Sequence, residues 1–155
     1  MGLAPYTKKR NFKKTLEPLA PLRATHGQRK NKPIFVVHKH FASHLHYDLR
    51  LEEGSVLKSW AVPKGPPEKA GEKRLAVQVE DHPLAYARFH GTIPEGEYGA
   101  GKVEIWDKGT YEISGRERGV VSFVLRGKKL KGRFSLVRFR PPRQWLLIKQ
   151  KTTHP

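Results

Sequence analysis

The feature that most constrains the fold of this chain is a series of short apolar runs that begins at Ile34 and continues almost to the C-terminus. Apolar and polar residues alternate within the runs, and glycines and prolines separate them. A period of two turns one side of each run toward a core, which is typical of short strands in an all-β domain. The pattern predicts strands at residues 34–40, 45–52, 56–62, 74–79, 102–107, 110–113, 120–125, 133–139 and 145–149.

Helical signals are scarce in this sequence. Only residues 84–88 are expected to form one or two helical turns. So many short strands favour a mainly β fold, namely a compact closed or nearly closed β-barrel with one or two short helices.

Two glycine-containing segments are predicted to connect strands. Residues 107–110 read Asp-Lys-Gly-Thr and predict a tight hairpin turn. Residues 91–101 are rich in glycine, but they lack the Gly-Lys-Ser/Thr ending and the following helix of a phosphate-binding P-loop. We therefore interpret residues 91–101 as a structural loop.

Positive charge is concentrated at the two ends of the chain. The formal net charge is +17, of which residues 1–32 contribute +8, residues 126–155 contribute +10 and residues 33–125 contribute −1. This distribution predicts a basic N-terminal arm at 1–33 and one globular domain at 34–151. It favours a nucleic acid as the partner over a membrane surface, and a solvated basic surface is the alternative explanation.

The chain contains no cysteine, which excludes disulfides, thiolate metal sites and cysteine nucleophiles. Its first residues do not read as a signal peptide, and no run approaches the roughly 20 apolar residues of a membrane span. We expect a soluble, cytoplasmic monomer that does not enter a membrane. Any metal must bind through nitrogen and oxygen atoms.

Four of the eight histidines lie between His38 and His46. On a strand, His46, Asp48 and Arg50 project from one face. The other face carries Leu45, Tyr47, Leu49 and Leu51. A turn near residues 42–43 would place His40 on the neighbouring strand beside them. This arrangement favours His40, His46 and Asp48 as metal ligands. His38 and His44 are the less favoured alternatives.

Two imidazoles and one carboxylate suit Mn²⁺, Fe²⁺, Zn²⁺ or Co²⁺. Arg50 adds a planar group that can bind a phosphate through two hydrogen bonds. Metal ligands beside an arginine indicate phosphoryl chemistry. His82, in a second polar cluster, is a candidate general acid or base, or a cationic partner for a phosphate oxygen. Lys64 and Arg74 are further candidates for phosphate binding, although such residues are more often surface charges.

Several long motifs in one order closely resemble the 3′-phosphoesterase domain of bacterial and archaeal DNA ligase D. They are residues 35–51, 60–65 (Trp-Ala-Val-Pro-Lys-Gly), 80–86 (Glu-Asp-His-Pro-Leu-Ala-Tyr) and 91–101. The resemblance implies a β-barrel with a manganese-favouring site, which Co²⁺ or Zn²⁺ could also occupy. It implies removal of a 3′-terminal ribonucleoside, then of the remaining 3′-phosphate, to leave a ligatable 3′-hydroxyl in DNA repair.

The resemblance also implies roles for individual residues. The metal ligands fall on His40, His46 and Asp48, and the catalytic and phosphate-contacting groups on Arg50, His82 and Tyr86. The supporting substrate-binding positions are Lys64, Arg74, Glu80, Arg10, Glu17 and His38. The implied partners are a nucleic acid with a 3′-ribonucleotide or 3′-phosphate end, and a separate DNA ligase and repair polymerase acting in trans.

Two positions depart from the family pattern. Asn11 follows Arg10 where the family has aspartate, and His38 stands where the family commonly has glutamine. Asparagine cannot supply the charge of an aspartate. We expect this change to weaken the contribution of the arm to ribonucleoside removal more than to phosphate release. Two other functions remain open from the residues alone: a metal-free nucleic-acid-binding barrel, and a cupin-like metal oxygenase built on two histidines and one carboxylate.

Overall fold

The computed structural model describes residues 2–10, 17 and 32–151, which form nine strands and two short helices. The helices are α1 (Ala4–Lys8) and the 3-10 helix η1 (Leu84–Arg88), the latter with the predicted bounds. The strands are β1 (Ile34–Phe41), β2 (Leu45–Glu53), β3 (Val56–Val62), β4 (Lys73–Pro83), β5 (Gly91–Ile93), β6 (Gly101–Glu117), β7 (Val120–Arg126), β8 (Lys131–Arg140) and β9 (Gln144–Lys149).

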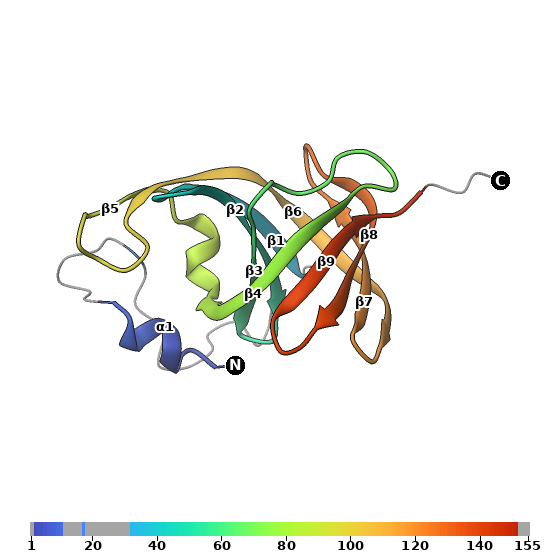
Figure 1. Ribbon diagram of the computed structural model, residues 1–155, viewed down its shortest axis with the longest axis horizontal. Coiled ribbons are helices and arrows are strands. Elements are labelled where there is room, and N and C mark those ends of the chain that lie inside the picture. Colours follow the sequence, from blue (N-terminus) through green and yellow to red (C-terminus); the bar gives the residue numbers. More distant parts are fainter. Residues whose placement is uncertain (1, 11–16, 18–31, 152–155) are drawn as a thin grey trace.

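The strands form one antiparallel sheet that closes on itself. Their order is β1-β2-β3-β4-β9-β8-β7-β6, and β1 also pairs with β6, so eight strands close a barrel while β5 is an extra strand on β6. Figure 1 shows the long strand β6 crossing from β5 to the far end of the barrel. The predicted mainly β barrel is confirmed. Among the described residues, no helix is long and apolar enough to cross a bilayer.

The β1–β4 half of the barrel buries side chains on both of its faces. All eight barrel strands contribute to an inner core, to which β2 gives Leu49 and Leu51. A second core lies outside this half, where α1 and η1 cover the sheet and Tyr6 packs with Val36 and Leu57. The polar face of β2, which is the face of Arg50, is therefore enclosed by protein rather than open to solvent.

Strand β4 carries a β-bulge that sequence patterning does not reveal. Ser59 of β3 pairs with Val79, whereas Leu57 pairs with His82, so two residues of β3 oppose three of β4. The extra residue places Glu80 and His82 on the same side as Val79, toward the outer cleft described below. His82 therefore lies within β4, which continues to Pro83, beyond the strand predicted at residues 74–79.

The predicted hairpin turn at 107–110 was also wrong, because these residues lie inside the continuous strand β6. The Asp107 carboxylate accepts hydrogen bonds from the backbone N–H groups of Lys108, Lys128, Lys129 and Leu130, at 2.8–3.1 Å. Asp107 thus holds the β7–β8 connection instead of forming its own turn.

Gly109 is explained by a close approach between strands. A Cβ atom on Gly109 would lie 2.0 Å from the backbone oxygen of Arg126 on the neighbouring strand β7. Glycine is thus required by a tertiary contact, although in the sequence the same Asp-Lys-Gly pattern indicates a turn.

We predict that Asp107→Ala lowers the free energy of unfolding by about 3 kcal/mol, since it leaves the buried N–H of Leu130 and three partly buried backbone N–H groups without their acceptor. Urea denaturation measures this loss. The control is Glu104→Ala, which removes the same charge from the same strand but breaks only a surface pair with Lys102. Equal stability of the two variants would contradict the role given to Asp107.

Candidate active site

Three side chains from β1 and β2 meet as a compact set of metal-binding donors. One donor atom from each of His40, His46 and Asp48 can be chosen so that all three lie within 4.8 Å of one another. Asp48 Oδ2 lies 3.8 Å from His40 Nδ1 and 3.4 Å from His46 Nε2. His40 pairs directly with His46 across the two strands, which explains why their rings converge.

The other nitrogen of each imidazole is hydrogen-bonded to a backbone carbonyl. His40 Nε2 lies 2.7 Å from the Gly99 oxygen, and His46 Nδ1 lies 3.1 Å from the His44 oxygen. Since a carbonyl only accepts, each of these nitrogens carries the hydrogen, which leaves His40 Nδ1 and His46 Nε2 with lone pairs directed at the Asp48 side. Residues 91–101 thus contribute an anchor for a histidine of the candidate metal site.

Neighbouring charges set the protonation of these three groups. Burial alone would raise the pKa of Asp48, but the Arg50 guanidinium and the two imidazoles hold that pKa below its ordinary value. A hydrogen bond to Asp48 raises the pKa of His46, whereas burial lowers the pKa of His40. Asp48 is accordingly a carboxylate at neutral pH and attracts a cation to this position.

Arg50 is a buried cation held by three different partners. Its Nε donates to His38 Nδ1 at 3.1 Å, its Nη1 to Ser59 Oγ at 2.9 Å, and its Nη2 to Asp48 Oδ2 at 3.4 Å. The guanidinium also lies 4.8 Å from the centre of the Tyr86 ring. This fixed orientation is what a phosphate-binding arginine needs.

His38 positions Arg50 and is not among the converging metal donors. Its Nε2 lies 3.0 Å from the Phe89 carbonyl oxygen, so Nε2 carries the hydrogen and Nδ1 accepts from Arg50. Burial, followed by the charge of Arg50, lowers the pKa of His38 to about 3. The imidazole is therefore neutral, and both of its nitrogens are engaged. A glutamine side chain would likewise offer a donor, its amide NH2, and an acceptor, its carbonyl oxygen.

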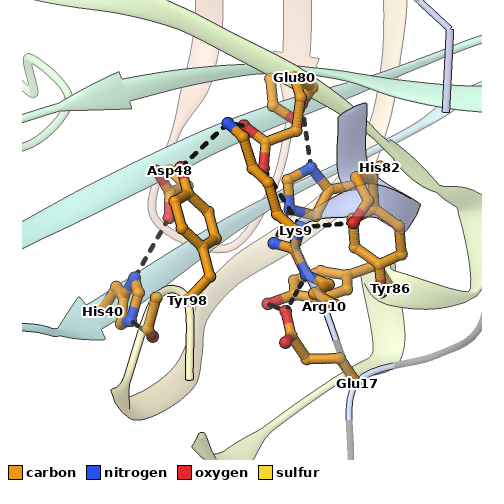
Figure 2. Close-up of polar contacts among 12 residues, drawn as sticks. Lys9, Arg10, Glu17, His40, Asp48, Glu80, His82, Tyr86 and Tyr98 are labelled. Carbon is orange, nitrogen blue, oxygen red and sulfur yellow. Dashed lines mark hydrogen bonds and ion pairs between the residues drawn. The ribbon is translucent and has the colours of Figure 1, made fainter. Parts of the chain in front are cut away.

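A second group of charged residues faces the metal donors (Figure 2). Arg10 contacts Glu17 at 2.8 Å, Glu80 at 3.3 Å and His82 Nε2 at 3.3 Å. The Tyr86 hydroxyl donates to Glu17 at 3.1 Å. This network joins the N-terminal segment to β4 and η1, so the described part of the predicted arm contributes to the site.

His82 is neutral in this arrangement. Its Nδ1 lies 3.0 Å from the backbone oxygen of Glu80, so this nitrogen donates and Nε2 accepts from Arg10. Burial, together with the charges of Arg50 and Arg10, lowers the pKa of His82 well below its ordinary value. An anion in the cleft would oppose those two charges and raise the pKa of His82.

One cleft of about 250 Å³ unites these groups. The predicted residues that line it are Arg10, Glu17, His40, His46, Asp48, Arg50, Glu80, His82 and Tyr86. The cleft lies on the outer side of the β1–β4 half of the barrel. Asn11, the departure from the family pattern, lies outside the described residues.

Lys64 and Arg74 lie elsewhere. They line a second cleft of about 210 Å³ with Tyr47 and Trp106. Residues two apart on a strand point to the same side, so Arg74 lies on the side of Ala76, which belongs to the inner core. The structure therefore does not bring these two basic residues together with the metal donors.

Sequence reasoning missed three residues beside the first cleft. Ser59 holds Arg50, Lys9 binds Glu80 at 3.4 Å, and Tyr98 lines the mouth of the cleft. Only the strand register reveals that Ser59 lies opposite Arg50. Lys9 is one of many basic residues in its segment, so no sequence signal distinguishes it. A lone aromatic residue among glycines was the available signal for Tyr98.

Comparison with known proteins reveals similarity to multifunctional end-joining proteins. The chain is 49% identical over 159 residues to the multifunctional non-homologous end joining protein LigD of Pseudomonas aeruginosa, covering 96% of this chain and 18% of that protein. It is 42% identical over 160 residues to the LigD protein of Mycolicibacterium smegmatis, covering 96% of this chain and 20% of that protein. The chain thus spans about a fifth of the length of these relatives.

A family model describes the same relationship at the level of a domain. The model of the DNA ligase D 3′-phosphoesterase domain matches residues 38–138. The matched segment contains the three metal donors together with Arg50, His82 and Tyr86. The chain therefore belongs to the DNA ligase D 3′-phosphoesterase domain family.

Proposed function

We propose that this chain is a metal-dependent 3′-end-healing phosphoesterase that removes 3′-terminal ribonucleosides and 3′-phosphates from nucleic acid. The observation that carries the proposal is the convergence of three metal donors and Arg50 in one cleft, with Asp48 bonded to Arg50 at 3.4 Å. Metal and arginine side by side are suited to the charge of a phosphoryl group. Membership of a family named for 3′-phosphoesterase activity supports the same chemistry.

The donor set fits a divalent transition metal. Two neutral imidazole nitrogens and one carboxylate oxygen leave coordination positions for water or substrate, which suits Mn²⁺, Co²⁺ or Zn²⁺. We propose Mn²⁺ as the native ion because the family resemblance implies it. When bound, the metal would neutralise charge on the phosphate oxygens and polarise the phosphorus–oxygen bonds.

The charge balance of the cleft also supports a metal requirement. Among the described side chains in or beside the cleft, three carry +1, namely Lys9, Arg10 and Arg50. Three carry −1, namely Glu17, Asp48 and Glu80. These formal charges sum to zero, whereas a terminal phosphate carries a charge of about −1.5 to −2. A divalent cation on the three donors supplies the missing positive charge.

Arg50 retains the capacity to bind the phosphate directly. A guanidinium has five N–H groups, and the described residues occupy one each on Nε, Nη1 and Nη2. One N–H on each terminal nitrogen remains for the oxygens of a phosphate. Because Arg50 is already oriented by His38, Ser59 and Asp48, it loses little freedom when it binds.

His82 and Tyr86 complete the proposed machinery. The substrate phosphate would raise the pKa of His82 and let this side chain accept or return a proton during cleavage. Burial raises the pKa of Tyr86, so its phenol stays protonated and is a hydrogen-bond donor. Arg10, held between two carboxylates, stabilises negative charge beside His82.

The biological setting that we propose is end joining in DNA repair. The similar LigD proteins carry that process in their names, and the chain spans about a fifth of their length. We propose that a DNA ligase and a repair polymerase act on the healed end, and that the basic ends of this chain bind the nucleic-acid backbone.

We predict that His40→Ala and Asp48→Ala each lower the rate of phosphate release from a 3′-phosphate oligonucleotide by more than about 100-fold. Chelation of the wild-type protein should abolish activity, and Mn²⁺ should restore it. His90→Ala is the matched control, because His90 is exposed. Full activity of Asp48→Ala without bound metal, measured by plasma mass spectrometry, would refute the proposal.

We further predict that His38→Leu lowers kcat/KM by about tenfold or more, whereas His38→Gln stays close to wild type. Leucine removes the acceptor of Arg50 Nε, so His38→Leu should also lower the free energy of unfolding by roughly 1–3 kcal/mol. Steady-state kinetics and urea denaturation of both variants test this. Equal defects in the two variants would show that hydrogen bonding to Arg50 is not what His38 contributes.

A further inference from the structure

Tyr98 is an exposed aromatic side chain at the mouth of the active-site cleft. It lines the cleft, yet 48% of its surface is exposed and it belongs to neither hydrophobic core. Figure 2 shows its side chain between His40 on one side and Arg10 on the other. Because the ring lines the cleft and is still exposed, it is available for contact with a ligand bound there.

The loop that carries Tyr98 is firmly attached to the metal donors. The next residue, Gly99, accepts the hydrogen bond from His40 Nε2 at 2.7 Å. Within the loop, the backbone N–H of Glu97 donates to Pro94 and that of Ala100 donates to Glu97. The preceding strand β5 is anchored because its residue Ile93 is buried in the second core. The ring is therefore held at a set position relative to the proposed metal ligands.

Two cations lie against the ring. Lys9 Nζ is 4.6 Å and the Arg10 guanidinium carbon is 5.4 Å from the ring centre, and Lys9 Nζ donates to the Tyr98 hydroxyl at 3.3 Å. An aromatic ring flanked by cations is the combination with which proteins bind single-stranded nucleic acid, since bases stack on the ring while cations bind phosphates.

The size of the cleft places a nucleobase near this ring. At about 250 Å³ the cleft is smaller than the roughly 300 Å³ at which pockets for drug-sized ligands begin. It suits a phosphate and part of its sugar. The base attached to that sugar would then lie at the mouth, where Tyr98 is exposed.

We propose that Tyr98 is the stacking platform for the base of the 3′-terminal nucleotide and makes the site selective for ends that carry an intact base. This inference rests on the proposed function. Stacking is tolerant of base identity because every base has a π-face, so the selection is for the presence of a base. The contact acts on substrate binding and not on the chemical step.

The test compares two oligonucleotides that end in a 3′-phosphate, one with a normal terminal base and one with an abasic sugar at that position. Tyr98→Ala should raise KM about tenfold for the base-bearing end, the usual size of a stacking contact, and leave kcat unchanged. KM for the abasic end should not change. Tyr98→Phe should match wild type, because it keeps the ring.

Phe139→Ala is the matched control, since Phe139 is 47% exposed on β8 and does not line the cleft. Equal losses on both oligonucleotides, or a defect in Tyr98→Phe as large as that in Tyr98→Ala, would overturn the proposal.

Fluorescence of a terminal 2-aminopurine gives a readout independent of catalysis. Binding to the wild-type protein should quench it by stacking, and binding to Tyr98→Ala should not. Absence of quenching in the bound wild-type complex would overturn the proposal that Tyr98 stacks on the terminal base. If the wild-type protein releases no phosphate from either oligonucleotide, the proposed function fails, while quenching that depends on Tyr98 would still support the platform.

Discussion

The buried guanidinium of Arg50 is the constraint around which the site is organised. The residue is 3% exposed, and a charge removed from water must be paired and hydrogen-bonded to remain in a folded protein. His38, Asp48 and Ser59 meet that need from three successive strands of the barrel. The same contacts orient Arg50 and keep Asp48 ionised, so the stabilisation of one buried charge also prepares a candidate metal ligand.

The closed barrel allows this arrangement because it is covered on its outer side. Tyr6 of α1 and Tyr86 of η1 pack over the β1–β4 half, which turns a polar strand face into the wall of a cleft. The N-terminal segment is therefore part of the site: Arg10 links Glu17 to β4 and reaches His82. A cover made from a distant segment buries the charged side chains of the cleft wall, which strengthens their interactions.

Much of the fold and of the site could be predicted because local pattern and local structure agree. Alternation along residues 45–52 assigned Asp48 and Arg50 to one face, and the strand pairing of His40 with His46 completed the trio. The prediction failed at residues 107–110, where Asp107 accepts hydrogen bonds from a distant loop and Gly109 leaves room for the backbone of Arg126. A turn signal and a long-range contact use the same residue types, so sequence alone could not separate them.

The residue pattern was enough to show which chemical groups are available and which strand face carries them, because side-chain alternation depends only on the local backbone. The tertiary structure alone decided how those groups meet. The bulge in β4 turned Glu80 and His82 toward the cleft, and strand register placed Ser59 opposite Arg50. Barrel packing separated Lys64 and Arg74 from the metal donors and placed Tyr98 at the mouth. Register, bulges and closure arise from pairing between distant segments, and no local pattern encodes them.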